Sequence, residues 1–375
     1  MSRLTLAPRA ILIDVIPPSM EKPVAERRLL ELDALTKTYG GIVVVKLIQR
    51  RALPDYRTYV GSGKLQELIE IGKKEKAELV IINNLLKPKQ MFEVGEILRK
   101  EKMVVWDRVD LILKIFDRHA KTSEAKLQIK LAAIRHMGPR IFGMGMELMQ
   151  QAGGTGTRGG AGETNTEIMK RHLAQQERHV KNDLERLAKS RGEHRRRRDR
   201  IGLKTVSIVG YTNAGKSSLL TALTRKGAYA ANELFATLDT RIGKLYIPLP
   251  VPQEILLSDT IGFIQDLPPQ LIDAFRSTLD ETIDADAIMQ VVDAADPHLS
   301  EKLEEVEEVL RSLHVDEKPR LYAFNKIDLL KKKDVAALKK AFSDLKPVFV
   351  SSQKKLGLEE LKQRLAYVIK KTPAV

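Results

Sequence analysis

The segment Gly-Tyr-Thr-Asn-Ala-Gly-Lys-Ser at residues 210–217 constrains this sequence more than any other feature. The apolar run Val206–Val209 precedes it, and Ser218-Leu219-Leu220 after it indicates the start of a helix. A strand, a glycine-rich turn and a helix N-terminus in this order let backbone N–H groups surround a β-phosphate. In such a loop Lys216 would bridge the β- and γ-phosphates, and Ser217 would bind Mg²⁺. The phosphate-binding candidates are Gly210, Asn213, Ala214, Gly215, Lys216, Ser217 and Ser218.

A second motif, Asp-x-x-Gly at 259–262, follows the apolar run Ile255–Leu257. Asp259 is expected to hold Mg²⁺ through a water molecule, and the N–H of Gly262 to sense the γ-phosphate. Between the two motifs a switch loop must supply a threonine to the metal. We choose Thr237 for this role, with Thr240 as the alternative.

The segment Asn-Lys-Ile-Asp at 325–328 follows the apolar strand Leu321–Phe324 and predicts which base the bound nucleotide carries. The Asp328 carboxylate would accept two N–H groups from the Watson–Crick edge of guanine, while Asn325 fixes the loop. Adenine would leave a buried carboxylate unpaired, which costs several kcal/mol. The predicted ligand is therefore GTP or GDP. Further candidates for base contact are Lys326, Ser351 and Ser352.

The hydrolytic residues show one departure from the usual pattern. Phe263 stands where many GTPases have the glutamine that orients the attacking water, and phenylalanine cannot do this. With Lys216, Thr237 and Gly262 as the catalytic candidates, we expect intrinsic turnover on the order of 10⁻⁴–10⁻³ s⁻¹, accelerated by a partner. Asn213 matches the asparagine that holds K⁺ in potassium-activated GTPases, where the ion offsets transition-state charge.

Charge and composition limit the kinds of partner that the chain can bind. All of its formal net charge of +15 lies in residues 1–200, which hold 40 Lys and Arg against 25 Asp and Glu. Such asymmetry predicts a polyanionic partner for that half. The chain has no cysteine and no apolar run long enough to span a membrane, so disulfides and thiolate metal centres are excluded and a cytoplasmic location is expected.

Patterning divides the chain into three parts. Residues 1–118 alternate apolar strands with amphipathic stretches, which predicts a small α/β subdomain with a largely parallel sheet. Residues 119–200 contain narrow apolar stripes at helical spacing, which predict two long antiparallel helices packed like a coiled coil. Residues 201–375 repeat strand, turn and helix and predict a Ras-like P-loop domain. The fold class is thus α/β throughout, with a helical hairpin between two α/β parts.

The glycine-dense stretch 138–162 predicts a long loop between the two helices. A loop of this length inside a compact protein suggests a function, and we expect it to reach RNA. The basic stretch 191–200 lies at the end of the second helix. Contact with RNA phosphates would relieve the repulsion among its own positive charges. The RNA-binding candidates are Arg140, Arg158, Arg195, Arg196, Arg197, Arg198 and Arg200.

Taken in order, these motifs resemble the HflX family, which falls in the translation-factor class of P-loop GTPases. The resemblance covers about Ile11 to Lys371 and rests on YVGSGK, GGTGTRGGAGET before a long basic helix, GYTNAGKS, FATLD, DTIGFI, DLPPQLIDAF and NKID. It implies a monomer that binds the large ribosomal subunit through ribosomal RNA, not DNA. It also implies dissociation of stalled or idle ribosomes under stress, with the 138–162 loop near the peptidyl-transferase centre.

Three departures and two alternatives accompany the resemblance. Gly160-Ala161-Gly162 replaces the usual Gly-Pro-Gly, Ser352-Gln353 stands where Ala-Lys is more common, and the small C-terminal domain of some relatives is not expected.

One alternative is a ribosome-assembly GTPase acting on precursors of the large subunit. The other is a signalling GTPase whose basic half contacts a protein or the surface of an anionic membrane.

Overall fold

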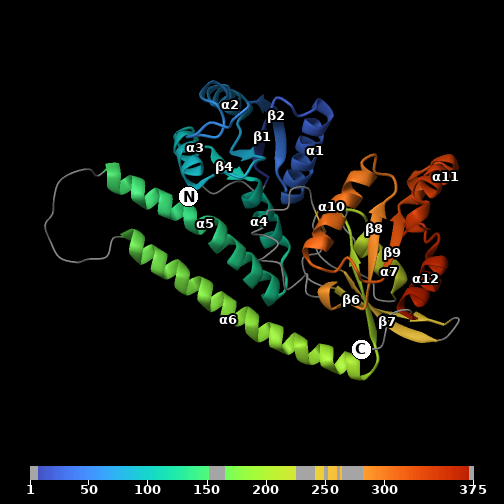
Figure 1. The fold of residues 1–375 in the computed structure, drawn as a ribbon. Helices are drawn as coiled ribbons and strands as arrows, with labels where there is room; N and C mark the ends of the chain where they lie inside the picture. The colour runs from blue at the N-terminus through green and yellow to red at the C-terminus, as the bar shows by residue number, and fades with distance from the viewer. Residues whose placement is uncertain are drawn as a thin grey trace. The chain divides into compact units, whose positions relative to one another are not determined.

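A computed structural model of the chain describes residues 7–151, 165–224, 241–248, 252–259, 262–263 and 282–370 (Figure 1). The chain divides into two compact units. Unit 1 contains the residues up to Arg118 together with Lys126–Asp183, and unit 2 contains His119–Ala125 and the residues from Leu184 onward.

Unit 1 is built on a parallel four-stranded sheet in the order β2-β1-β3-β4. Nearly every residue of β1 is buried, as expected for a parallel strand with helices on both of its faces. This confirms the parallel α/β layer predicted from the alternating pattern. The strands are β1 (Arg9–Ile16), β2 (Ile42–Arg50), β3 (Leu79–Ile82) and β4 (Val104–Asp107), and the helices between and after them are α1 (Lys22–Tyr39), α2 (Ser62–Glu75), α3 (Pro88–Lys100) and α4 (Arg108–His119).

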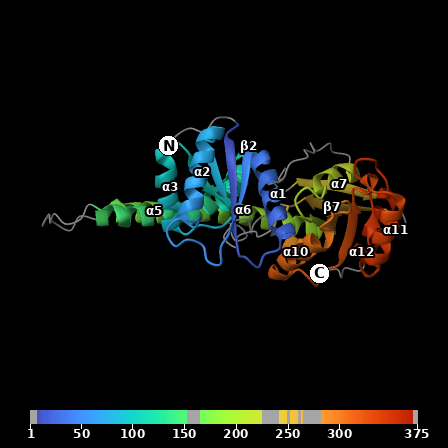
Figure 2. The same cartoon turned by 90° about the horizontal axis from the view of Figure 1, so that it is seen from above.

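Helices cover both faces of this sheet. Figure 2 shows α2 and α3 on one side of the strands and α1 on the other. Ile11 and Ile13 of β1 pack against Leu68 of α2 and Leu98 of α3 in one apolar cluster. Alternation along a strand sends every second side chain to the same face, so one short strand serves two cores.

Two long helices follow, α5 (Ser123–Gln151) and α6 (Asn165–Arg200). Within unit 1 they are joined by an ion pair between Arg135 and Glu177, whose Nε and Oε1 atoms lie 3.2 Å apart. Within unit 2, Arg191 of α6 pairs with Glu124 at the start of α5. The two helices predicted for this part of the chain are therefore present.

The predicted start of the connecting loop, at Gly138, was wrong. Helix α5 continues through Gly138 and Pro139 to Gln151, so Arg140 is a helical residue. Gly138 is buried against Leu173 of α6, whose Cδ1 atom would lie 3.9 Å from an added Cβ. Packing against a second helix outweighs the roughly 1 kcal/mol that an interior glycine costs a helix. The rest of the predicted loop, including Arg158, lies outside the described residues.

Unit 2 carries a six-stranded sheet in the order β10-β9-β8-β5-β7-β6. Among the described strands of this sheet, only the edge strand β6 runs antiparallel, paired with β7, while the other neighbouring strands are parallel. The described elements are β5 (Lys204–Val209), α7 (Lys216–Leu223), β6 (Arg241–Ile247), β7 (Gln253–Asp259), β8 (Ala287–Asp293), α10 (Leu299–Ser312), β9 (Arg320–Asn325), α11 (Lys332–Ala341), β10 (Val348–Phe349) and α12 (Leu358–Lys370).

Apolar clusters on both faces bury this sheet and fix the position of the loops at its edge. Val206 and Ile208 of β5 pack with Leu219 of α7 and Leu365 of α12 in one cluster. On the opposite face, Val209 packs with apolar residues of α10 in a second cluster. The α/β fold class, with a P-loop domain after the other elements, is confirmed. Among the residues that the structure describes, no helix is both long and apolar enough to cross a membrane.

Candidate functional site

The candidate site lies where the parallel strands of unit 2 end. The C-terminal ends of β5, β7, β8 and β9 are neighbours in the sheet, and each is followed by a loop at the same edge. Open α/β sheets bind ligands at this edge, outside the carboxyl ends of the strands. The sheet order therefore brings the three sequence motifs to one place.

The turn after β5 has a shape that demands glycine at two positions. Gly210 has a φ of 149°, and a Cβ atom there would lie 2.2 Å from the carbonyl oxygen of Val291. Gly215 has a φ of 93°, and its Cβ would lie 2.2 Å from Nδ2 of Asn325. Any side chain at either position would displace a neighbouring strand or loop. The predicted phosphate loop is thus packed tightly against β8 and β9.

Lys216 begins α7 and points back along this turn. Its Nζ donates hydrogen bonds to the carbonyl oxygens of Gly210 and Tyr211, at 3.1 and 3.0 Å. Burial lowers the pKa of Lys216 to about 8, and the nearby Asp259 carboxylate offsets part of that shift. An ammonium group held without full hydration is favourably placed to receive phosphate oxygens, whose charge would restore its pKa.

Ser217 and Asp259 lie together beside the N-terminus of α7. Ser217 Oγ donates a hydrogen bond of 2.6 Å to Asp259 Oδ2, and Asp259 is fully buried. A hydroxyl and a carboxylate are hard oxygen ligands of the kind that Mg²⁺ prefers, so these residues fit the predicted metal. Thr237 and the alternative Thr240 lie outside the described residues.

Gly262 and Phe263 join the second motif to the phosphate loop. The N–H of Thr212 donates to the carbonyl oxygen of Phe263 at 2.7 Å, and the N–H of Phe263 donates to Gly210 at 3.2 Å. A Cβ at Gly262 would lie 2.9 Å from both Nζ of Lys216 and the backbone Cα of Thr212, so a side chain there would displace the phosphate loop. The backbone of Gly262 is therefore adjacent to Lys216, where the predicted γ-phosphate contact requires it.

The side chain of Phe263 is buried in the apolar cluster of Val209, Tyr211 and Leu310. Sequence reasoning placed this residue at the water-orienting position but assigned it no role. The structure gives it one, because the ring anchors the second motif in the core under α10.

The predicted base-binding residues are also brought together. Asn325 Nδ2 donates to the carbonyl oxygen of Ala214 at 3.0 Å, and Asn325 Oδ1 accepts the N–H of Ser352 at 3.0 Å. Ser351 Oγ donates to Asp328 Oδ1 at 2.6 Å. Asn325 thus connects the phosphate loop to the last loop of the sheet, and Ser351 orients the Asp328 carboxylate.

One residue near this site was missed. Asp293 ends β8, and its Oδ2 lies 2.7 Å from Nζ of Lys326. This ion pair holds Lys326, whose φ of 66° places it in a left-handed turn. The signal was available in the sequence, since an aspartate directly follows the buried run 287–292 at the same sheet edge.

Three family models match consecutive parts of the chain. They are described as GTP-binding GTPase N-terminal, GTP-binding GTPase Middle Region and 50S ribosome-binding GTPase, and they match residues 26–117, 119–198 and 205–326. The chain is 39% identical over 353 residues to GTPase HflX of Caldanaerobacter subterraneus, covering 94% of this chain and 78% of that protein. It is 36% identical over 337 residues to GTPase HflX of Escherichia coli, covering 90% and 78%.

The chain belongs to the HflX family of GTPases. It is accordingly a GTP hydrolase, as its motifs predict. A solved structure described as SsGBP in complex with GDP is also similar, with a TM-score of 0.52 and 26% identity. That similarity covers 96% of this chain and 98% of the other, so it extends beyond the P-loop domain.

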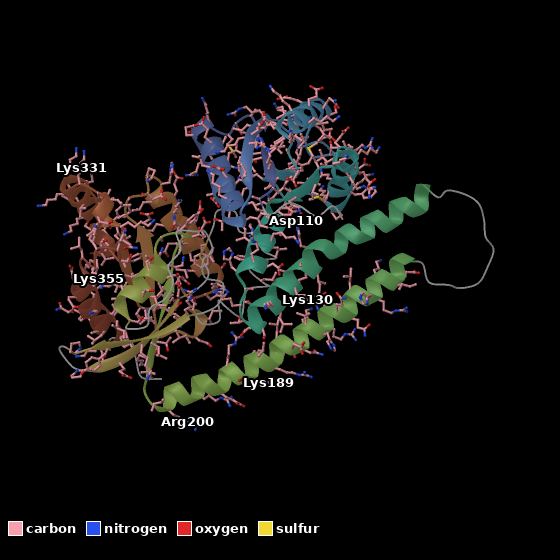
Figure 3. The ribbon with its side chains drawn as sticks, turned by 180° about the vertical axis from the view of Figure 1, so that it is seen from behind. Asp110, Lys130, Lys189, Arg200, Lys331 and Lys355 are labelled. Carbon is pink, nitrogen blue, oxygen red and sulfur yellow. The ribbon has the colours of Figure 1, made fainter. Side chains whose placement is uncertain are left out.

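The residues predicted to bind RNA in this HflX-family chain are only partly described. Arg196 and Arg200 are exposed on α6. Arg195, Arg197 and Arg198 lie on the same helix, which continues to Arg200. Figure 3 labels Lys189 and Arg200 on this part of α6.

Proposed function

We propose that this HflX-family GTPase binds the large ribosomal subunit in its GTP form and dissociates stalled or idle ribosomes under stress. Ribosome-stimulated hydrolysis of GTP then drives its release. The protein acts in the cytoplasm as a monomer with bound Mg²⁺. The observation that carries the proposal is the match of residues 205–326 to a family of ribosome-binding GTPases. This range includes the Ser217–Asp259 pair and the Asn325–Ala214 hydrogen bond.

The charge of α6 supports an RNA partner. Its described exposed basic residues are Lys170, Arg171, Arg178, Lys181, Arg186, Lys189, Arg196 and Arg200. Lys and Arg side chains displace the counterions of RNA phosphates, so this contact supplies affinity that falls steeply with salt. The helix therefore provides binding, while the nucleotide determines when binding occurs.

The nucleotide would act through its contacts with the second motif. A γ-phosphate beside Lys216 and Gly262, with Mg²⁺ at Ser217 and Asp259, would hold the switch segments in one arrangement. Hydrolysis would remove those contacts. A ligand can shift a conformational equilibrium only by its difference in affinity for the two states, so the ribosome must bind one of them more tightly.

The decisive experiment measures GTP turnover with and without purified large subunits, together with co-pelleting of the protein in GTP, GDP and a non-hydrolysable GTP analogue. We expect stimulation by the subunit and pelleting chiefly with the analogue. Arg196→Glu should reduce both effects, whereas Lys74→Glu, an exposed charge reversal on α2, should not. Unchanged phosphate release together with failure to pellet in the triphosphate form would falsify the proposal.

Sedimentation separates the proposed role from ribosome assembly. Dissociation converts whole ribosomes into subunits when protein and GTP are added, whereas an assembly factor leaves mature ribosomes intact and associates with precursor particles. A signalling GTPase with a non-RNA partner would show no stimulation by ribosomes at all.

We further propose K⁺ as an activator held by Asn213. This residue has a φ of 62° in the phosphate loop, a conformation that asparagine tolerates better than most residues. Turnover in the presence of ribosomes should be faster in KCl than in NaCl, and Asn213→Ala should abolish the difference. Equal rates in the two salts with the wild-type chain would remove K⁺ from the mechanism.

A further inference from the structure

Three side chains of unit 1 converge at a place that the nucleotide site does not use. Asp107 ends β4, Asp110 lies in the first turn of α4, and His136 comes from α5; Figure 3 labels Asp110. One carboxylate oxygen of each aspartate and a ring nitrogen of His136 all lie within 4.8 Å of one another. The Asp107 side chain is fully buried, and those of Asp110 and His136 are only 14% and 7% exposed.

His136 and Asp107 form a long hydrogen bond, and the same ring nitrogen of His136 also faces Asp110. His136 Nε2 lies 3.3 Å from Asp107 Oδ1 and 3.4 Å from Asp110 Oδ1. Charge-assisted N–H···O bonds are shorter, about 2.7–2.9 Å, and one Nε2–H group can only be shared between two carboxylates in a weaker bifurcated bond. Around a tetrahedral zinc ion with bonds of about 2.0–2.1 Å, neighbouring ligand atoms lie about 3.3–3.4 Å apart. The two spacings therefore match two edges of a zinc tetrahedron.

The backbone holds both carboxylates in this arrangement. The N–H of Asp110 donates to Asp107 Oδ1 at 2.9 Å, and the N–H of Asp107 donates to Asp110 Oδ2 at 3.1 Å. These reciprocal bonds leave Asp110 Oδ1 turned toward His136. Outer hydrogen bonds of this kind orient metal ligands and are part of metal sites generally.

We propose that Asp107, Asp110 and His136 bind one divalent ion of the zinc class. One imidazole nitrogen and two carboxylate oxygens favour Zn²⁺ over Mg²⁺ or Ca²⁺, which take oxygen ligands. Three protein ligands leave the fourth position of the tetrahedron for water. The ion connects α5 to the junction of β4 and α4, so it fixes the long helix within unit 1.

The test uses the full chain saturated with GDP and Mg²⁺, so that the G-domain metal site is filled. Co²⁺ is titrated and followed by visible absorption, and Zn²⁺ is then added in competition. We expect about one equivalent of Co²⁺ with the strong absorption of four-coordinate cobalt, which Zn²⁺ removes. His136→Gln and Asp110→Asn should weaken binding at least about tenfold, whereas His179→Gln, an exposed histidine on α6, should not.

Asp110→Asn is the milder variant because it keeps the oxygen that accepts the Asp107 N–H. Thermal unfolding of each variant without metal shows whether it folds. A wild-type chain that gives no four-coordinate cobalt band overturns the proposal, whether or not the variants fold. A folded variant that binds Co²⁺ as tightly as the wild type overturns it too, and in either case the three residues form only an ion-paired cluster.

Discussion

Ser217 Oγ donates a 2.6 Å hydrogen bond to Asp259 Oδ2, so the two proposed magnesium ligands are bonded directly to each other. An incoming Mg²⁺ ion must replace this bond, with Ser217 binding the metal directly and Asp259 holding it through a water molecule. Ser217→Ala removes one hard ligand, and we expect the Mg²⁺ concentration for half-maximal GTP affinity to rise at least about tenfold. Ser312→Ala, at the far end of α10, should leave that concentration unchanged. Equal Mg²⁺ requirements in all three proteins would contradict the assignment.

Asp328→Asn should change the preferred base. The variant has an amide in place of the carboxylate that accepts two N–H groups of guanine. We therefore expect GTP affinity to fall at least about 100-fold. Xanthosine triphosphate, which presents the complementary acceptor, should bind more tightly to the variant than to the wild type. The measurement is competition against a fluorescent nucleotide. Retention of guanine preference by the variant would show that Asp328 does not read the base.

The buried ammonium of Lys216 predicts a pH dependence. Its pKa is lowered to about 8, while that of the unfolded chain stays near 10.5, so the unfolded chain binds more protons between these values. The stability of the nucleotide-free chain should therefore rise with pH across this window. Phosphate binding restores the proton, so GDP affinity should fall about tenfold between pH 7 and pH 9.

Guanosine is the matched control for this effect, because it carries the same base but no phosphate. The affinity of guanosine should not depend on the charge of Lys216. Any loss of affinity with pH that guanosine and GDP share reports titration of the base. A GDP affinity that follows the guanosine curve over the whole range would contradict the prediction.

Phe263→Ala should destabilise the protein by about 3–5 kcal/mol, since the ring is buried in an apolar cluster. Phe263→Gln should also destabilise and should not speed intrinsic hydrolysis, because the side chain at this position points into the core. Phe263→Leu keeps an apolar group and should cost less. Urea unfolding and single-turnover hydrolysis check these outcomes, and faster hydrolysis by the glutamine variant would refute this role of the ring.

Salt dependence checks the proposed role of α6. Arg196→Glu should weaken association with large subunits and flatten the plot of log affinity against log salt concentration, since fewer counterions are displaced. Lys74→Glu provides the comparison at equal net charge. Identical slopes for both variants would place the RNA contact elsewhere.

The nucleotide site could be predicted from sequence because its three motifs each follow an apolar strand. Parallel strands end at a common edge, so Lys216, Asp259 and Asn325 had to meet there. The ends of helices were harder to predict from the sequence. The local cost of Gly138 and Pro139 argued for a loop, but contact with Leu173 on a helix distant in sequence keeps α5 intact. Phe263 likewise has a core role that depends on where α10 packs.

Asn325 is fully buried and bonded to Ala214 on one side and Ser352 on the other. These contacts within the protein hold the phosphate-binding and base-binding halves in register. Pre-organisation of this kind reduces the ordering entropy lost on binding. Association of guanine nucleotides with these described loops should consequently be fast, and differences between GTP and GDP should arise mainly in how long each stays bound.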